Sequence, residues 1–224
     1  MKKALIVVDV QNDFCPGGSL AVPEGDKVVP VINDLLPKFD LIIFTKDWHP
    51  QNHFGFASNH KNVKPFEHLM VLESTGGFGG VMDINGPKVD LGIMWPDHCV
   101  QNTPGADIHP GIKFENCPKE FFIFKKGEDP QKQGYSAFEI KDLAGFLDGK
   151  EITQLFVCGL ALDYCVKSTA IDAAKAGFEV AVIEDACASI DPNINPVLEE
   201  FNKEGIAFIE SWEITEYILQ KYNC

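Results

Sequence analysis

The sequence predicts an α/β protein of three layers (α/β/α), in which helices cover both faces of a mainly parallel sheet of about six strands. Six short runs are almost continuously apolar and rich in Val, Ile and Phe, which is typical of strands covered on both faces. Segments with apolar residues three and four positions apart lie between most of these runs, as expected for helices. Alternating strands and helices indicate parallel pairing through right-handed crossover connections.

The elements follow one another along the chain. We expect strands at residues 4–10, 40–47, 120–127, 154–160, 179–185 and 206–211. We expect helices at residues 26–39, 138–149, 163–177, 195–205 and 212–222, and Gly177 and Gly205 stand where two of these helices should end. Residues 47–117 differ, because glycine, proline, histidine and aromatic residues accumulate there without sustained periodicity. A loop region of this length is usually functional.

Length and cysteine usage bound the organisation of the chain. Neither an internal repeat nor a linker divides it, so we expect one domain over residues 1–224, with a loop region for a metal site at about 47–117. A chain of 224 residues can bury a stable core without disulfide bonds. Seven cysteines without a framework pattern favour a reducing compartment, and we therefore expect a cytoplasmic protein.

Charge and hydropathy exclude two classes of partner. The formal net charge is -14, whereas nucleic-acid binding needs clustered lysine and arginine, so we expect no nucleic-acid partner. No apolar run approaches the roughly 18 to 20 residues needed to cross a bilayer, and we expect no membrane partner. A small-molecule substrate is the expected partner, and a homo-oligomer is left open.

Four reactive side chains lie at or just beyond the ends of predicted strands. Asp9 and Asp47 close the first two strands, Lys126 closes the third, and Cys165 follows the fourth. In an open parallel sheet, ligands bind beyond the carboxyl ends of the strands. We therefore expect these four side chains to meet at one edge of the sheet.

Cys165 is a candidate nucleophile at the start of a predicted helix. Unpaired N–H groups at a helix start stabilise a thiolate, lower the pKa of the thiol and can hold an oxyanion. Asp9 is able to accept the thiol proton, and the Lys126 cation favours ionised neighbours. Taken singly, each has a simpler interpretation: Cys165 as a buried core residue, Asp9 as a turn cap and Lys126 as a solvated lysine.

A second group of residues predicts a metal site. Asp47 and His49 are two positions apart and so point the same way in an extended segment, and His53 follows four residues later. His98 stands in a further loop motif, "MWPDHCVQNTPG". One aspartate and three histidines suit a divalent ion, with zinc, iron and manganese all compatible. Phe14 and Trp95 could line a slot for a flat ring or simply pack their loops.

Five motifs in this order resemble the nicotinamidase family, which includes pyrazinamidases, in the isochorismatase-like hydrolase superfamily. The resemblance covers nearly the whole chain. The motifs are "ALIVVDVQNDFCPGGSLAV" (4–22), "TKDWHPQNHFGF" (45–56), "MWPDHCVQNTPGADIH" (94–109), "FKKG" with "GYSAFE" (124–127 and 134–139), and "VCGLALDYCVKSTAIDAAKAG" (157–177).

The resemblance implies an isochorismatase-like hydrolase fold, an activity and a set of site residues. The activity would be hydrolysis of nicotinamide to nicotinate and ammonia through a cysteine thioester, in NAD salvage, with pyrazinamide as a further substrate. The implied catalytic triad is Cys165, Asp9 and Lys126, and Lys125 would point to the other face of the strand. The implied oxyanion hole is formed by the backbone N–H groups of Ala161 and Cys165, after a cis peptide between Leu160 and Ala161.

The family pattern also implies a cofactor and substrate contacts. One divalent metal ion, zinc as the first choice and iron or manganese as the alternatives, would position the pyridine ring. Its implied ligands are Asp47, His49, His53 and His98. The residues implied to contact the substrate are Phe14, Trp95 and Tyr135.

Three alternative functions stay open at this point. One is a metallohydrolase in which metal-bound hydroxide attacks and Cys165 is structural. The second is a related hydrolase that acts on another small amide or on isochorismate. The third is a non-catalytic binding module on the same fold. The segments 59–92 and 126–134 vary within the family pattern and lie near the expected pocket mouth, so they leave substrate scope and oligomer contacts open.

Overall fold

A computed structural model describes residues 2–72 and 88–222 of the chain, and residues 73–87, part of the expected 59–92 segment, lie outside the described residues. Six strands form the main sheet. They are β1 (Lys2–Val8), β2 (Leu41–Asp47), β5 (Phe121–Lys126), β6 (Ile152–Leu160), β7 (Glu179–Ala188) and β8 (Ala207–Ile209). These correspond to the six strands that the apolar runs predict.

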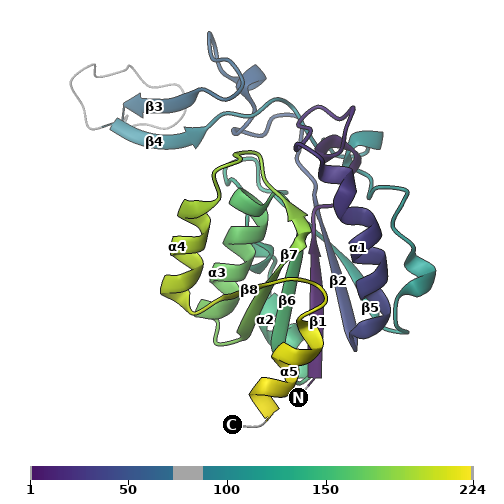
Figure 1. Ribbon diagram of the computed structural model, residues 1–224. Helices are drawn as coiled ribbons and strands as arrows, with labels where there is room; N and C mark the ends of the chain where they lie inside the picture. The colour runs from purple at the N-terminus through teal and green to yellow at the C-terminus, as the bar shows by residue number, and fades with distance from the viewer. Residues whose placement is uncertain (1, 73–87, 223–224) are drawn as a thin grey trace.

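The main sheet is parallel throughout, with the strand order β5-β2-β1-β6-β7-β8 (Figure 1). Ile6 at the centre of β1 pairs with Ile43 of β2 and with Val157 of β6. Side chains of β1 alternate between the two faces of the sheet, so Leu5 and Val7 enter one core and the intervening residues enter the other. Strands buried on both faces explain the continuous apolar runs of the sequence.

Helices cover both faces and complete the three predicted layers. Helix α1 (Val28–Leu35) and helix α5 (Ile214–Tyr222) contribute to one core, through side chains such as Ile32 and Ile214. The other core receives Leu147, Ala170 and Phe201 from α2 (Leu143–Gly149), α3 (Lys167–Lys175) and α4 (Asn195–Glu204). The α/β/α class with a mainly parallel sheet is therefore confirmed.

Two helices, α2 and α3, begin four or five residues later than the sequence predicts, for local reasons. The segment expected at 138–149 starts with a single 3-10 turn, Ala137–Glu139, which Ser136 caps by accepting the Phe138 N–H at 3.1 Å. The segment expected at 163–177 starts with a π-helical turn, Leu162–Val166, and becomes α-helical only at Lys167. Cys165 lies in that π-helical turn, a form frequently found at functional sites.

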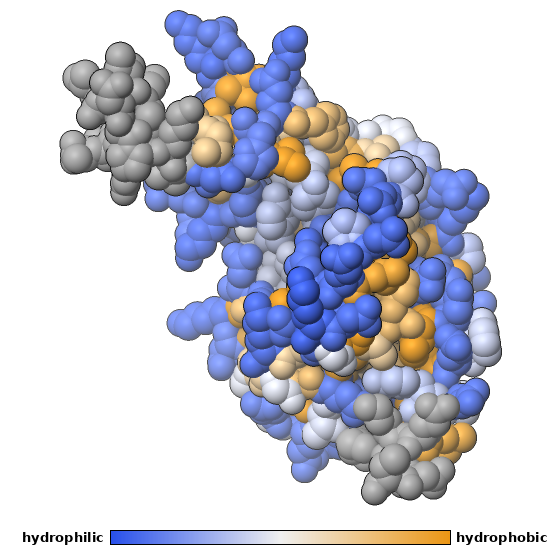
Figure 2. Space-filling view, turned by 60° about the vertical axis from the view of Figure 1, so that its left-hand side comes forward, coloured by the Kyte–Doolittle hydropathy of each residue, from blue (hydrophilic) through white to orange (hydrophobic). Residues whose placement is uncertain are grey.

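The irregular region contains a hairpin that periodicity did not reveal. Strands β3 (His68–Leu72) and β4 (Lys88–Ile93) pair antiparallel and extend from one end of the main sheet (Figure 1). Phe66, 60% exposed, precedes β3, and Met70 of β3 is 48% exposed. Figure 2 shows such apolar side chains among hydrophilic ones on this part of the surface.

None of the helices within residues 2–72 and 88–222 has the length and hydropathy that a membrane span requires.

Candidate active site

Lys126 joins the three residues that the sequence places at the carboxyl edge of the sheet. Its Nζ lies 2.8 Å from Asp9 Oδ2 and 3.4 Å from Cys165 Sγ. The same ammonium donates to Asp47 Oδ1 at 2.6 Å and to the Gly134 carbonyl at 2.9 Å. All of these side chains are buried, and Asp9 has no exposed surface. The thiol, carboxylate and ammonium therefore converge, while the neighbouring Lys125 is exposed, as the strand alternation predicts.

Asp9 is held in an unusual backbone conformation just after β1. Its φ is 48°, in the left-handed region that aspartate tolerates better than most residues. The Asp9 N–H donates to the Thr45 carbonyl at 3.3 Å, and the Thr45 hydroxyl donates to Asp9 Oδ1 at 2.7 Å. One oxygen of the carboxylate therefore contacts Thr45 and the other contacts Lys126.

The protonation of Cys165 differs from the sequence expectation. Burial raises the pKa of the Cys165 thiol well above its ordinary value, and the Asp9 and Asp47 carboxylates raise it further, against the opposing effect of Lys126. The N–H groups at the helix start were expected to lower the pKa of the thiol. Their effect is outweighed, because desolvation of a fully enclosed sulfur penalises the thiolate. The resting residue is a neutral thiol that needs a base.

Asp9 has the properties of that base. Burial raises its pKa to about 6, partly offset by the Lys126 ammonium and the Thr45 hydroxyl. A carboxyl group with this pKa is mostly ionised at neutral pH but accepts a proton more readily than an exposed aspartate. Burial opposes the charge of Lys126, yet Asp47 and Asp9 keep its pKa well above the ordinary value, so the ammonium stays charged.

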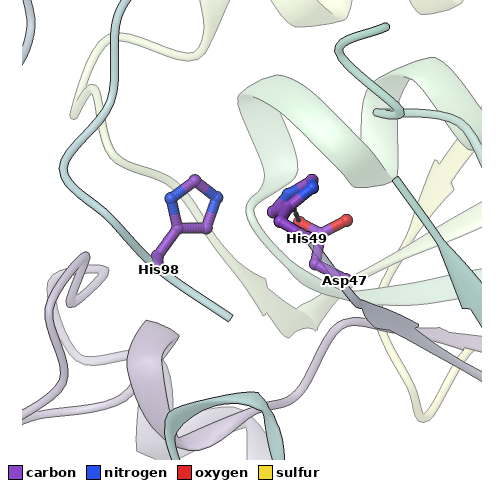
Figure 3. A group of neighbouring side chains, drawn as sticks. All are labelled: Asp47, His49 and His98. Atoms are coloured by element: carbon purple, nitrogen blue, oxygen red, sulfur yellow. Dashed lines mark ion pairs between the residues drawn. The ribbon is translucent and has the colours of Figure 1, made fainter. Parts of the chain in front are cut away.

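Asp47, His49 and His98 form the candidate metal centre. One potential ligand atom of each lies within 4.8 Å of those of the other two, and all three residues are buried. His49 Nε2 is 3.5 Å from Asp47 Oδ2 at the end of β2. Figure 3 shows His49 beside Asp47, with His98 directed toward them from a separate segment. The Lys126 ammonium holds the pKa of Asp47 below its usual range despite burial, so Asp47 offers an anionic oxygen.

The donor set fits a divalent ion. The Nδ1 atoms of His49 and His98 each lie 2.8 Å from a backbone carbonyl, that of Gly127 and that of Pro96 respectively. Because a carbonyl only accepts, both Nδ1 atoms carry the proton, which leaves Nε2 with a free lone pair in the neutral ring. This orientation of histidine by a backbone carbonyl is typical of metal ligands. Burial lowers the pKa of His98 to about 4, which keeps that ring neutral.

His53 lies beside this centre but uses both of its ring nitrogens elsewhere. Its ring centroid is 4.2 Å from that of His49. Its Nε2 donates to the Lys132 carbonyl at 2.7 Å, and its Nδ1 accepts the Gly55 N–H at 3.1 Å. Three of the four expected ligands, Asp47, His49 and His98, therefore have lone pairs free for an ion. The sequence prediction that His53 is the fourth ligand is untested, and because both of its nitrogens contact backbone groups, we expect it to support the centre without binding the ion.

A cavity joins the thiol to the metal centre. The expected substrate contacts Phe14, Trp95 and Tyr135 line it, and Trp95 Nε1 donates to the Tyr135 hydroxyl at 2.9 Å. Asp9 and Lys126 are not among the lining residues, but Lys126 contacts two that are, Asp47 and Cys165. The cavity is also lined by the expected residues Asp47, His49, His53, His98, Ala161 and Cys165.

Sequence reasoning missed several residues around this cavity. Four of them line it: Leu20 and Tyr164 stand within quoted motifs, whereas Gln133 and Ile190 come from segments outside them. Gln11 is fully buried, and its side-chain amide binds the backbone of Asp47. It accepts the Asp47 N–H at 2.7 Å and donates to the Asp47 carbonyl at 2.9 Å. Gln11 stands within a quoted motif, two residues after Asp9, and this position was the signal that the sequence offered. The Leu160–Ala161 peptide is cis, as the family pattern implies.

The fold and sequence together define the class of protein. The family model described as "Isochorismatase domain" matches residues 3–195. That match covers the main site residues from Asp9 to Cys165 and defines the protein as a hydrolase of this fold.

Individual proteins of known name show which branch of these hydrolases the chain is most similar to. The nicotinamidase of Acinetobacter baylyi is 42% identical over 94% of each chain. The solved nicotinamidase/pyrazinamidase of Acinetobacter baumanii has a TM-score of 0.81 and 36% identity, covering 95% of this chain and 98% of its own. The pyrazinamidase of Pyrococcus horikoshii, solved in complex with zinc, has a TM-score of 0.72 and 39% identity, covering 94% and 99%. The chain belongs to the nicotinamidase family of the isochorismatase-like hydrolases.

Proposed function

We propose that this protein hydrolyses nicotinamide to nicotinate and ammonia through a thioester on Cys165. The observation that carries the proposal is the convergence of Asp9 Oδ2 and Cys165 Sγ on the Lys126 ammonium at 2.8 and 3.4 Å. A buried base beside a buried thiol is the arrangement that nucleophilic catalysis requires. The names of the relatives supply the substrate, with pyrazinamide as a second amide of the same shape.

The first half of the reaction forms the thioester. Asp9 accepts the proton of Cys165, and the sulfur attacks the carboxamide carbon. The oxyanion that develops on the amide oxygen is held by the backbone N–H groups of Ala161 and Cys165. As the C–N bond breaks, Asp9 returns the proton to the nitrogen, and ammonia leaves.

The second half releases the acid. Asp9 takes a proton from water, and the hydroxide attacks the thioester carbon while the same N–H groups hold the oxyanion. The C–S bond breaks, the thiolate takes the proton from Asp9, and nicotinic acid leaves, becoming nicotinate as it gives its own proton to water. Lys126 keeps its charge throughout, orienting Asp9 and stabilising the anionic states.

The ring of the substrate would lie in the cavity between Phe14 and Trp95, with Tyr135 completing the wall. Asp47, His49 and His98 would hold a divalent ion, zinc first and iron or manganese as alternatives, which would supply an electrophilic contact for the ring nitrogen. This contact would position the amide over Cys165. His53 would support His49 by packing against its ring.

The reaction would belong to NAD salvage and take place in the cytoplasm. A nucleophilic thiol needs reducing conditions, and six cysteines within the described residues are free. A homo-oligomer stays a prediction.

An ammonia-release assay tests the proposal, combined with elemental analysis of the same sample. Nicotinamide should release one ammonia per nicotinate formed, and Cys165→Ala should abolish release while keeping the metal. Release at the normal rate by Cys165→Ala, or no release from nicotinamide by metal-loaded protein, would contradict the proposal. Activity that survives complete alkylation of Cys165 would instead favour attack by metal-bound hydroxide.

A further inference from the structure

We infer that Thr45 is a positioning residue, whose hydroxyl fixes the Asp9 carboxylate so that Oδ2 faces Lys126 and Cys165. The inference rests on the proposed function, in which Asp9 moves the proton of the thiol. Thr45 lies in β2 and is 1% exposed, and its side chain is directed to the end of β1. Thr45 does not line the cavity and acts through Asp9.

The contacts of Thr45 explain how the carboxylate is oriented. The Thr45 hydroxyl has one proton, and it donates that proton to Asp9 Oδ1 at 2.7 Å. Oδ2 is thereby left for the Lys126 ammonium at 2.8 Å, which also contacts the sulfur. Without the hydroxyl, Oδ1 would be a buried anionic oxygen short of a donor, and rotation about the side-chain bond would allow it to compete for Lys126.

Thr45 also holds the backbone that carries the base. Asp9 has a left-handed φ of 48°, and its N–H lies 3.3 Å from both the carbonyl oxygen and the hydroxyl oxygen of Thr45. The last paired residues of the two strands are Val7 and Phe44, so Asp9 stands beyond the regular ladder. One threonine therefore contacts both the backbone and the side chain of the proposed base.

Three variants test this inference. Thr45→Val keeps the shape of the side chain and removes the hydroxyl, whereas Thr45→Ser keeps the hydroxyl and removes the methyl group. Thr169→Val is the matched control, because Thr169 is equally buried and its hydroxyl accepts the Ala137 N–H at 3.0 Å. If Thr45→Val does not fold, as judged by circular dichroism and thermal melting, Thr45→Ala replaces it with the same expectations.

Kinetics of ammonia release give the first readout. Thr45→Val should lower kcat about ten- to hundredfold, as expected for loss of a hydrogen bond to a charged group, with KM changed less than about threefold. Thr45→Ser should restore kcat to within about threefold, and Thr169→Val should keep the wild-type kcat whatever its melting temperature. A wild-type kcat in Thr45→Val, or a Thr45→Ser variant as slow as Thr45→Val, would overturn the inference.

Alkylation of the thiol gives a second readout that needs no substrate. The rate at which iodoacetamide modifies Cys165, followed by peptide mass, should fall in Thr45→Val, recover in Thr45→Ser and stay normal in Thr169→Val. If nicotinamide is not hydrolysed by the wild-type protein, the proposed function fails, while the alkylation rates still decide the role of Thr45. Equal alkylation rates in wild type and Thr45→Val would overturn it.

Discussion

Replacing Lys126 by methionine should destabilise the protein by about 3–5 kcal/mol near neutral pH. Methionine keeps the apolar stem and removes the charge from a side chain that is 1% exposed. The partners left behind are Asp9 at 2.8 Å and Asp47 at 2.6 Å, whose side chains are 0% and 4% exposed. Breaking a buried ion pair by removing one partner typically costs about 3–5 kcal/mol, because the remaining charge stays desolvated.

The stability lost in Lys126→Met should increase with pH. The folded pKa of Asp9 is already raised to about 6 by burial, so its ionised form opposes folding increasingly as the pH rises above its ordinary value of 3.8. Removing Lys126 raises that pKa further, since an opposing cation is lost. The destabilisation should therefore be larger at about pH 8 than at about pH 5, where Asp9 takes up a proton on folding.

Urea unfolding of metal-free protein at both pH values measures the effect. The matched control is Lys125→Met on the same strand, because Lys125 is exposed and its ammonium lies 4.1 Å from the centre of the Trp48 ring. An exposed cation–π contact contributes only about 0.5–1 kcal/mol, so the control should lose no more than this at either pH. A loss below about 1 kcal/mol in Lys126→Met, or one that is equal at both pH values, would refute the reasoning.

Three further predictions concern the metal centre and the base. His49→Ala should lose the metal and raise KM for nicotinamide. His53→Ala should keep one metal ion per chain by elemental analysis, because the ring nitrogens of His53 bind backbone groups. Equal loss of metal in both variants would show that His53 is a ligand. Removing the metal with a chelator should raise KM for nicotinamide, and adding back zinc, iron or manganese in parallel samples should restore the original KM. An unchanged KM after verified removal would speak against a role of the metal in positioning the substrate. The ratio kcat/KM should increase with pH around a midpoint near 6 as Asp9 ionises, and Asp9→Asn should be inactive at every pH; a flat profile through this range would exclude Asp9 as the base.

Much of the fold could be predicted from the sequence, because buried parallel strands leave an unmistakable apolar pattern. The runs around Ile6, Ile43 and Val157 are buried on both sides, and the strand-end rule then places the side chains that follow them at one edge. The β3 and β4 hairpin escaped this reasoning. Within the described residues its strands pair only with each other, and they reach the core at Ile93, where β4 ends, so burial imposes no strong alternation on most of their length.

The catalytic and metal-binding parts of the site could be predicted where residues carry reactive groups. Asp9, Lys126 and Cys165 stand at strand ends, whereas Thr45 looks like an ordinary strand residue, and its hydrogen bond to Asp9 depends on the register of β1 against β2. The pKa of Cys165 could not be read from a helix start, since its direction depends on how completely the fold encloses the sulfur.

Trapping the covalent intermediate tests the central claim most directly. Wild-type protein mixed with nicotinamide, quenched in acid within the first turnover and digested, should show a nicotinoyl thioester on the peptide that contains Cys165. The adduct should be absent from Cys165→Ala, and its decay should match the rate of nicotinate release. Turnover at the full rate with no adduct on Cys165 at any quench time, in a protein whose other cysteines are also unmodified, would contradict the account.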